Sequence, residues 1–208
     1  WLKLTNGDKT LVEGMKTLYG LFSQAPVLGS LIDPREVRKD LLSATFEELE
    51  PLLEKVLAKE EKRQDENAAE MGVTARGLVH AAEILTGSFH LIATNVPYLG
   101  RGKQDAALKE FCETYHKDAK ADLATCFVER CLTFCAKGGT AALVTPQNWL
   151  FLTTYKKLRR KLLAQAEWNF VARLGPRAFE TIGGEVVNVT LLSLTNGKPT
   201  DAHLLMGI

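Results

Sequence analysis

Long apolar runs are missing from this sequence. No stretch approaches the roughly 18 consecutive apolar residues that a membrane-spanning helix needs. A basic and apolar leader of the signal-peptide type is also absent. We therefore predict a cytoplasmic protein with no membrane partner.

Cysteine is scarce as well, with four residues in a chain of 208. Their spacing matches neither a zinc-ligand pattern nor the disulfide framework of a small secreted protein. The four histidines are scattered, and none has a second ligand at metal spacing. We expect reduced thiols in the core, histidines that lie at the surface or are satisfied in the core, and no metal site.

An excess of charge of one sign is also lacking, because 26 lysines and arginines nearly balance 25 aspartates and glutamates. With 46% apolar and 25% charged residues, the composition is that of a globular domain and excludes a disordered chain, a collagen or a coiled-coil rod. The charges are unevenly spread: residues 45–70 hold nine acidic and four basic side chains, whereas residues 156–161 hold five basic side chains and no acid. A polyanion should therefore prefer the second half of the chain.

The first 88 residues have the apolar spacing of helices. In residues 10–23, apolar side chains recur every three or four positions, which predicts a helix. A second helix is expected from Thr45, at a capping-box pattern, and a third over residues 74–85, ended by Gly87. None of these helices carries residues that point to chemistry.

From residue 89 onward, short apolar runs alternate with helical stretches. This alternation is typical of a sheet flanked by helices, so we predict an α/β fold. We expect the first strand to be buried, and Gly138 and Gly139 to end the second helix. The expected strands cover residues 90–93, 140–145, 168–174, 186–194 and 203–205, and the expected helices cover residues 105–115, 122–136 and 153–166.

The most informative residues follow the first of these strands: Asn95, Val96, Pro97 and Tyr98. In open α/β sheets, ligands bind beyond the carboxyl ends of strands. The Asn95 amide and the Val96 carbonyl offer acceptors on a stretch stiffened by Pro97, and Tyr98 offers a flat ring, which suits a planar base bearing an amino group. The alternative is an ordinary turn in which Tyr98 only packs. By themselves, the four residues favour that turn.

Three blocks in sequence change this interpretation. Residues 89–100 read FHLIATNVPYLG, residues 122–130 read DLATCFVER and residues 138–150 read GGTAALVTPQNWL. In order and spacing, residues 89–195 closely resemble the DNA adenine-N6 methyltransferases with an Asn-Pro-Pro-Tyr motif. That group includes restriction-modification methylases, restriction-methylase fusions and BREX-type methylases.

The resemblance implies an activity and a set of partners. The activity would be transfer of a methyl group from S-adenosylmethionine to the exocyclic amine of a flipped adenine in DNA. The partners would be DNA and other subunits of a restriction-modification or phage-defence system.

The resemblance also implies how the chain is divided. Residues 89–208 would form a partial catalytic methyltransferase domain, the second half of a doubly wound Rossmann-like sheet, preceded by a helical insertion of residues 1–88. No glycine-rich turn follows a strand and opens a helix in this sequence, and its first residue, Trp1, is not methionine. These absences predict a fragment without the main cofactor-binding half. We expect S-adenosylmethionine to bind in the full-length protein, and the isolated chain to be inactive.

Roles for the central residues follow from the family's motif. Asn95 and the carbonyl of Val96 would accept hydrogen bonds from the adenine amine, on the loop that Pro97 stiffens, and Tyr98 would stack on the flipped base. The family usually has proline at the position of Val96, so the loop loses some stiffness while it keeps the acceptor. Phe179 is the candidate for a second aromatic residue that closes over the base.

Further residues would border the site. Asp122, Leu123 and Phe127 match the family's block beside the cofactor pocket, although Leu123 and Phe127 fit plain core packing at helical spacing at least as well. Residues 145–149 follow the next strand and are expected to form a rigid wall of the site.

Basic side chains offer candidate contacts with DNA phosphates. Arg101 and Lys103 lie next to the motif in sequence and are the better candidates. Residues 156–161 would contact phosphates or form the solvated outer face of an amphipathic helix, with Leu158, Leu162 and Leu163 turned inward.

Two other functions stay open. One is a noncatalytic DNA-binding or specificity subunit on a degenerate methyltransferase fold, which the departure at Val96 favours. The other is a helical protein-interaction module, which the acidic first half of the chain favours.

Overall fold

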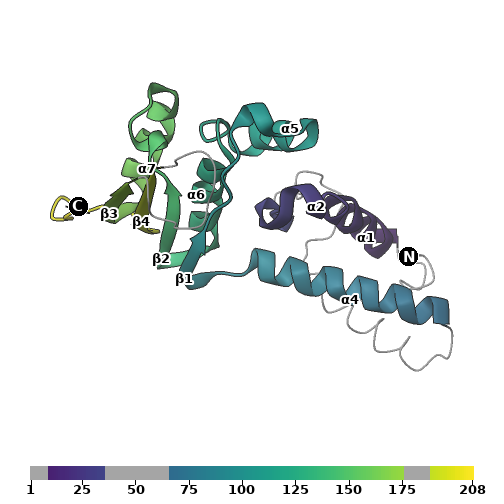
Figure 1. Ribbon diagram of the computed structural model, residues 1–208. Coiled ribbons are helices and arrows are strands. Elements are labelled where there is room, and N and C mark those ends of the chain that lie inside the picture. The colour runs from purple at the N-terminus through teal and green to yellow at the C-terminus, as the bar shows by residue number, and fades with distance from the viewer. Residues whose placement is uncertain (1–8, 36–65, 176–187) are drawn as a thin grey trace. The chain divides into compact units, whose positions relative to one another are not determined.

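The computed structural model describes residues 9–35, 66–175 and 188–208 (Figure 1). The chain divides into two compact units, Trp1–Gly87 and Ser88–Ile208. The helix expected from Thr45 and the candidate aromatic Phe179 lie outside the described residues.

The first unit is helical in its described part. Its elements are α1 (Lys9–Phe22), α2 (Ala25–Leu28), the 3-10 turn η1 (Gly29–Leu31) and α4 (Glu66–Thr86). The helix expected over residues 10–23 is confirmed as α1, which buries Val12 and Leu18. Helix α4 ends before Gly87 as expected, but it begins at Glu66, well before the predicted start at residue 74.

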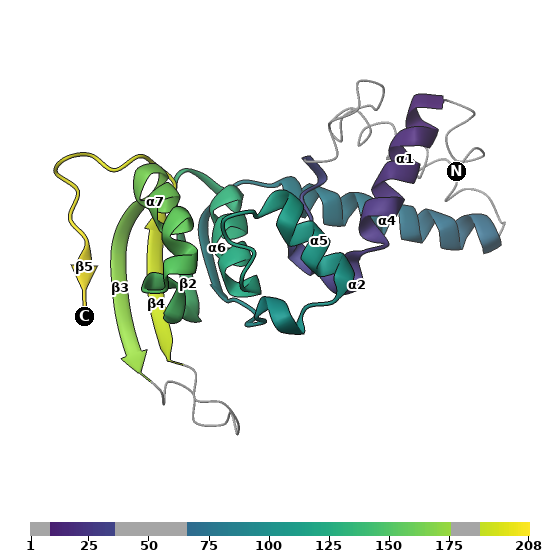
Figure 2. The same ribbon diagram turned by 90° about the horizontal axis from the view of Figure 1, so that it is seen from above.

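The second unit is built on a sheet, which confirms the α/β fold. Its strands are β1 (Phe89–Asn95), β2 (Cys135–Pro146), β3 (Glu167–Gly175), β4 (Val189–Thr195) and β5 (Met206–Gly207). Their order in the sheet is β1-β2-β4-β3-β5, and β5 forms its outer edge beyond β3 (Figure 2). Strand β1 runs parallel to β2, while β4 runs antiparallel to both β2 and β3. Strands β1, β2 and β3 therefore point the same way, as in a Rossmann-like sheet.

Helices connect the parallel strands. They are η3 (Arg101–Lys103), α5 (Ala106–Tyr115) and α6 (Leu123–Phe134) between β1 and β2, and η4 (Asn148–Leu150), η5 (Thr153–Tyr155) and α7 (Lys156–Gln165) between β2 and β3. The side chains of Asp105 and Asp122 cap the N-termini of α5 and α6. The three helices expected after the first strand are thus confirmed.

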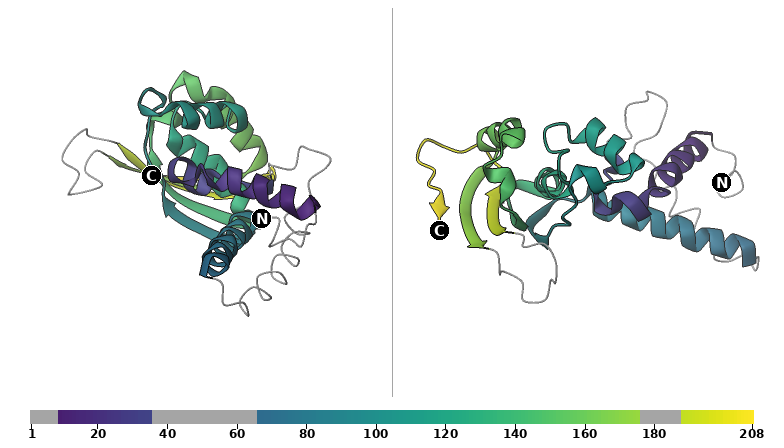
Figure 3. Two further views of the ribbon diagram at one scale, coloured as in Figure 1. Left: turned by 90° about the vertical axis from the view of Figure 1, so that its right-hand side faces the viewer. Right: turned by 45° about the horizontal axis from the view of Figure 1, so that its top comes forward.

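The core of this unit lies between the sheet and helices α6 and α7, which cover the same face of it (Figure 3). Along β2, Ala141, Leu143 and Thr145 are buried and alternate with half-exposed residues, as expected of a sheet covered on one face. Leu158 and Leu162 of α7 are buried as predicted, but Leu163 is exposed, because it lies about 100° further around the helix.

The expectation of a buried first strand is wrong. Strand β1 is an edge strand of the sheet, and six of its seven residues are exposed, including Leu91 at 65%. An apolar run of this length indicates a strand, but it does not indicate whether another strand or a helix covers it.

Gly138 and Gly139 also serve a different purpose from the one predicted. Helix α6 ends at Phe134, and both glycines lie inside β2, which begins at Cys135. Gly138 has a φ of +77°, and a Cβ on Gly139 would lie 2.6 Å from the carbonyl oxygen of Phe89 on β1. The pair therefore permits an irregular, close approach of β2 to β1.

The last two strands begin later than predicted. Strand β4 begins at Val189, and β5 begins at Met206, after the three residues expected to form it. Element ends depend on pairing with distant strands, which local patterns do not encode. In the described part of the chain, no helix is both long and apolar enough to cross a membrane.

Candidate functional site

The site lies at the carboxyl edge of the sheet in the second unit, which is the side where the parallel strands β1, β2 and β3 end. Asn95, the last residue of β1, is paired with Val144 near the carboxyl end of β2. Because β3 runs parallel to β2, its last residues and the loop after β2 lie at this same edge. The Asn95–Tyr98 segment therefore leaves the sheet at the edge where open α/β sheets bind ligands.

Asn95 and Val96 differ in their surroundings. The Asn95 side chain is exposed and forms no hydrogen bond with any described residue. Val96 has an exposed fraction of only 3%, and its N–H donates to the Val144 carbonyl at 3.3 Å. The Val96 side chain thus anchors the segment in the core, while Asn95 presents its amide at the surface.

Tyr98 is half-buried. Its hydroxyl oxygen is buried without a hydrogen-bond partner among the described residues. Burial, and secondarily the charge of Asp122, raises the pKa of Tyr98. The hydroxyl is therefore un-ionised at neutral pH.

Asp122 connects this loop to the start of α6. Its Oδ1 atom accepts hydrogen bonds from the N–H of Ala124 at 2.9 Å and from the N–H of Leu99 at 3.4 Å. The N–H of Leu123 donates to the Leu99 carbonyl at 3.0 Å, and the N–H of Arg101 donates to the Ala121 carbonyl at 3.0 Å. Hydrogen bonds thus join residues 95–101 to residues 121–124, two segments that lie far apart in the sequence.

The residues predicted to contact the cofactor lie at the N-terminus of α6 and in its first turns. Leu123 is buried and Phe127 is half-buried, one helical turn further on. The burial of Leu123 fits core packing. A contact of Asp122, Leu123 or Phe127 with the cofactor stays a prediction.

The two candidate phosphate ligands lie in different environments. Arg101 forms an ion pair of 2.7 Å with Glu113, which also lies 3.3 Å from Lys120. Lys103 is exposed in the short turn η3. Arg101 thus has a structural partner that the sequence did not reveal, because Glu113 comes from the next helix.

Buried and cross-strand contacts hold the stretch after β2, and its role as a wall of the site stays a prediction. Trp149 is fully buried, and its indole N–H donates to the Thr145 hydroxyl at 3.1 Å. Gln147 accepts a hydrogen bond of 2.9 Å from Nε of Arg173 on β3. Sequence reasoning missed this pair, because 26 residues separate the two side chains.

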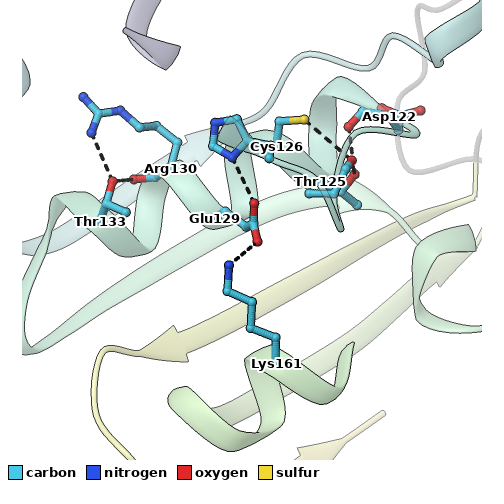
Figure 4. A network of polar contacts seen from close by, with 9 residues as sticks. Asp122, Thr125, Cys126, Glu129, Arg130, Thr133 and Lys161 are labelled. Carbon is cyan, nitrogen blue, oxygen red and sulfur yellow. Dashed lines mark hydrogen bonds and ion pairs between the residues drawn. The ribbon is translucent and has the colours of Figure 1, made fainter. Parts of the chain in front are cut away.

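Two cationic side chains of the basic helix α7 form contacts with other parts of the protein. Arg159 donates to the carbonyls of Trp149 and Leu152 at 2.6 and 2.7 Å. Lys161 lies 2.7 Å from Glu129 of α6 (Figure 4). These internal contacts belong to neither of the two predicted alternatives, a phosphate-binding face and a solvated face.

Glu129 is the centre of a buried polar network. Its Oε2 atom lies 2.9 Å from Nδ1 of His116, and both side chains are about nine-tenths buried. Burial would raise the pKa of Glu129, but the hydrogen bonds and charges of His116 and Lys161 hold it below its usual value. The carboxylate is therefore ionised and joins α6, α7 and the residue after α5.

The four cysteines are buried and free, as expected. Burial raises the pKa of Cys131 to about 12, so its thiol is protonated at neutral pH. Within the described ranges, no group of three or more His, Cys, Asp or Glu side chains could hold a metal ion.

Most of this chain matches a known protein family. The model of the Eco57I restriction-modification methylase family matches residues 1–179. The chain belongs to this family. The match extends over the helical unit and over most of the sheet, and it confirms the family resemblance that the three sequence blocks predicted.

Two curated relatives of this Eco57I-family chain are adenine-specific methyltransferases. BrxX of Escherichia coli O9:H4 (strain HS) is 32% identical over 93% of this chain. PglX of Lacticaseibacillus casei (strain Zhang) is 35% identical over 59% of it. The chain covers only 15% and 10% of these relatives' own lengths.

Solved structures of restriction-modification enzymes are also similar to the chain. LlaBIII, an ATP-dependent Type ISP enzyme bound to DNA, is 12% identical with a TM-score of 0.47, over 93% of this chain and 16% of its own. MmeI, a Type IIL enzyme in complex with DNA, is 20% identical with a TM-score of 0.44, over 57% of this chain and 17% of its own.

Proposed function

We propose that this chain is part of an adenine-specific DNA methyltransferase that transfers the methyl group of S-adenosylmethionine to N6 of a flipped adenine. The observation that carries the proposal is the placement of Asn95 and Tyr98. Both leave the carboxyl edge of the sheet on a loop that is bonded to the start of α6. Membership of the Eco57I family and two adenine-specific relatives support it.

Asn95 and Val96 align the amine. The Asn95 side-chain oxygen and the Val96 carbonyl accept its two hydrogens, which directs the nitrogen lone pair toward the methyl group. Asn95 is exposed and without a partner among the described residues, so its amide is available for this contact. The nitrogen would gain the methyl group as the sulfonium C–S bond breaks to leave a neutral thioether, and it would lose a proton to solvent, so the chemistry would depend on alignment more than on a strong base.

Tyr98 receives the extruded base. Extrusion costs a few kcal/mol of lost stacking, which an aromatic ring at the site offsets. The ring is half-exposed while its hydroxyl is buried, so its far end is packed in the protein. A ring held in this way loses little entropy when a base stacks on it.

The start of α6 would hold the cofactor. S-adenosylmethionine supplies an activated methyl group on a sulfonium when it is bound. Asp122 fits such a ligand because its Oδ2 atom makes no hydrogen bond with the described residues and can accept one from a hydroxyl. Phe127 adds a half-exposed ring, and Leu123, one helical turn before it, is buried. Residues 1–88 would be the helical insertion, and other subunits of a restriction-modification or phage-defence system would be further partners.

Asn95→Ala tests this function in the full-length protein. The variant should lose transfer of a labelled methyl group to DNA and keep its unfolding temperature, because the side chain supports no described contact. Transfer at a near wild-type rate would exclude Asn95 as the aligning residue.

DNA binding separates this function from a noncatalytic subunit. A base-flipping site should prefer a duplex with an adenine opposite an abasic site over the matched duplex, because the loosened base costs less to extrude. A noncatalytic subunit should bind both duplexes equally.

A further inference from the structure

An exposed aromatic ring and an arginine lie together at the same edge of the sheet as Asn95. Phe151 directly follows η4 in the loop after β2, and its exposed fraction is 60%. Arg173 is near the end of β3, and its guanidinium carbon lies 5.4 Å from the centre of the Phe151 ring. Strands β1, β2 and β3 run parallel, so both residues lie at the end of the sheet at which the Asn95–Tyr98 segment leaves β1, with β2 and β4 between β1 and β3.

The guanidinium of Arg173 is held in place but keeps its charge. Its Nε atom donates to Gln147 at 2.9 Å, and the face of Phe151 lies beside it. Among the described residues, no carboxylate forms an ion pair with Arg173, in contrast to Arg101, which Glu113 neutralises. The remaining N–H groups can therefore bind an external anion at a small cost in side-chain entropy.

Two further apolar side chains close by in the sequence are exposed. Leu152 and Leu174 are 50% and 47% exposed, and each directly follows Phe151 or Arg173 in sequence. An exposed aromatic ring beside an arginine without a described carboxylate partner is typical of an interaction surface. A nucleic acid offers both complements, a phosphate for the guanidinium and the face of a sugar or base for the aromatic ring.

We propose that Phe151 and Arg173 contact the DNA strand beside the target adenine, with Arg173 on a backbone phosphate and Phe151 against the adjacent nucleotide. This inference rests on the proposed function and adds two DNA-positioning residues to it. Gln147 acts through Arg173 by fixing the orientation of the guanidinium.

Salt-dependent DNA binding by the full-length protein tests the contact. The probe is a labelled mixed-sequence duplex that contains one adenine opposite an abasic site. Arg173→Gln should weaken binding and lower the slope of log K against log salt by about one, the signature of one lost phosphate contact. Arg173→Lys should keep the slope because it keeps the charge. A purely structural role of Arg173 would not produce this difference between the two variants.

Two further variants complete the experiment. Phe151→Ala should bind at least about fivefold more weakly with an unchanged slope, since the ring carries no charge. Lys198→Gln is the matched control, because this exposed cation lies beyond the carboxyl end of the antiparallel strand β4, at the opposite edge of the sheet. It should leave affinity and slope unchanged.

The outcomes distinguish this inference from the proposed function. If the wild type methylates DNA, but Arg173→Gln and Phe151→Ala bind like the wild type, the contact is overturned and the proposed function stands. If the wild type binds no DNA, both are overturned. A loss of slope in Lys198→Gln equal to that in Arg173→Gln would also overturn the contact, because the effect would then reflect net charge alone.

Discussion

The N–H of Leu123 donates a hydrogen bond of 3.0 Å to the carbonyl of Leu99. This bond joins the loop that carries Asn95 and Tyr98 to the first turn of α6, and the Asp122 carboxylate reinforces it by accepting from the N–H of Leu99. The loop is thus held at both ends, by the sheet before it and by a helix start after it.

Asp122→Ala should therefore affect both stability and activity. The variant loses the cap of α6 and one connection to the loop, which should lower the free energy of unfolding by about 1 kcal/mol. Methyl transfer should fall further than this loss explains, because the loop is less well placed. Asp122→Asn keeps an acceptor and should unfold at a temperature near the wild type. Thermal unfolding and methyl transfer, measured on both variants, check the prediction, and equal transfer by Asp122→Ala and the wild type would contradict it.

Tyr98→Phe should be harmless to stability and to methyl transfer. The hydroxyl is buried without a partner among the described residues, so its removal sacrifices no hydrogen bond. Tyr98→Ala removes the ring and should weaken binding of the abasic-site duplex by about 1 to 3 kcal/mol. A large loss of transfer in Tyr98→Phe would show that the hydroxyl contacts a ligand.

Lys103→Glu should weaken binding to every DNA sequence and flatten its salt dependence, because phosphate contacts carry no sequence information. Charge reversal at Arg101 should also lower stability, because it places two carboxylates together at the ion pair with Glu113. Salt titrations combined with thermal unfolding separate the two effects. An unchanged salt slope in Lys103→Glu would move the DNA path away from η3.

Glu129→Gln should destabilise the second unit by about 1 to 3 kcal/mol near neutral pH, since it removes the charge from hydrogen bonds that are largely buried. The folded-state pKa of Glu129 is lowered, so its contribution is fully present above the unfolded value of about 4.3 and is lost as pH falls through the folded value. The difference in Tm between wild type and variant should therefore narrow below about pH 4. A difference that stays constant from neutral to acidic pH would contradict an ionised Glu129.

Local patterns predicted a large part of the second unit. The helices expected over residues 105–115 and 122–136 are found as α5 and α6, because helix periodicity depends on residues within one or two turns. The position of Asn95 at the end of a strand followed in the same way. The roles of the site residues stay predictions that the variants above test.

Other features depend on partners far along the chain. The exposure of β1 follows from its place at the edge of the sheet, and the need for glycine at position 139 inside β2 follows from the close approach to Phe89. No window of a few residues contains this information, because the same apolar run fits an edge strand and a central one.

The sequence by itself determined the helices of the second unit, the alternation that makes the fold α/β, and the motif blocks that indicate the family. Only the tertiary structure decided which charged side chains form ion pairs within the protein and which can still bind a ligand. It pairs Arg101 with Glu113 and Lys161 with Glu129, and it leaves Arg173 beside Phe151 without a carboxylate among the described residues. The physical reason is that an ion pair depends on the distance between two side chains in space, and in this protein the order of the strands and the helical crossovers set that distance.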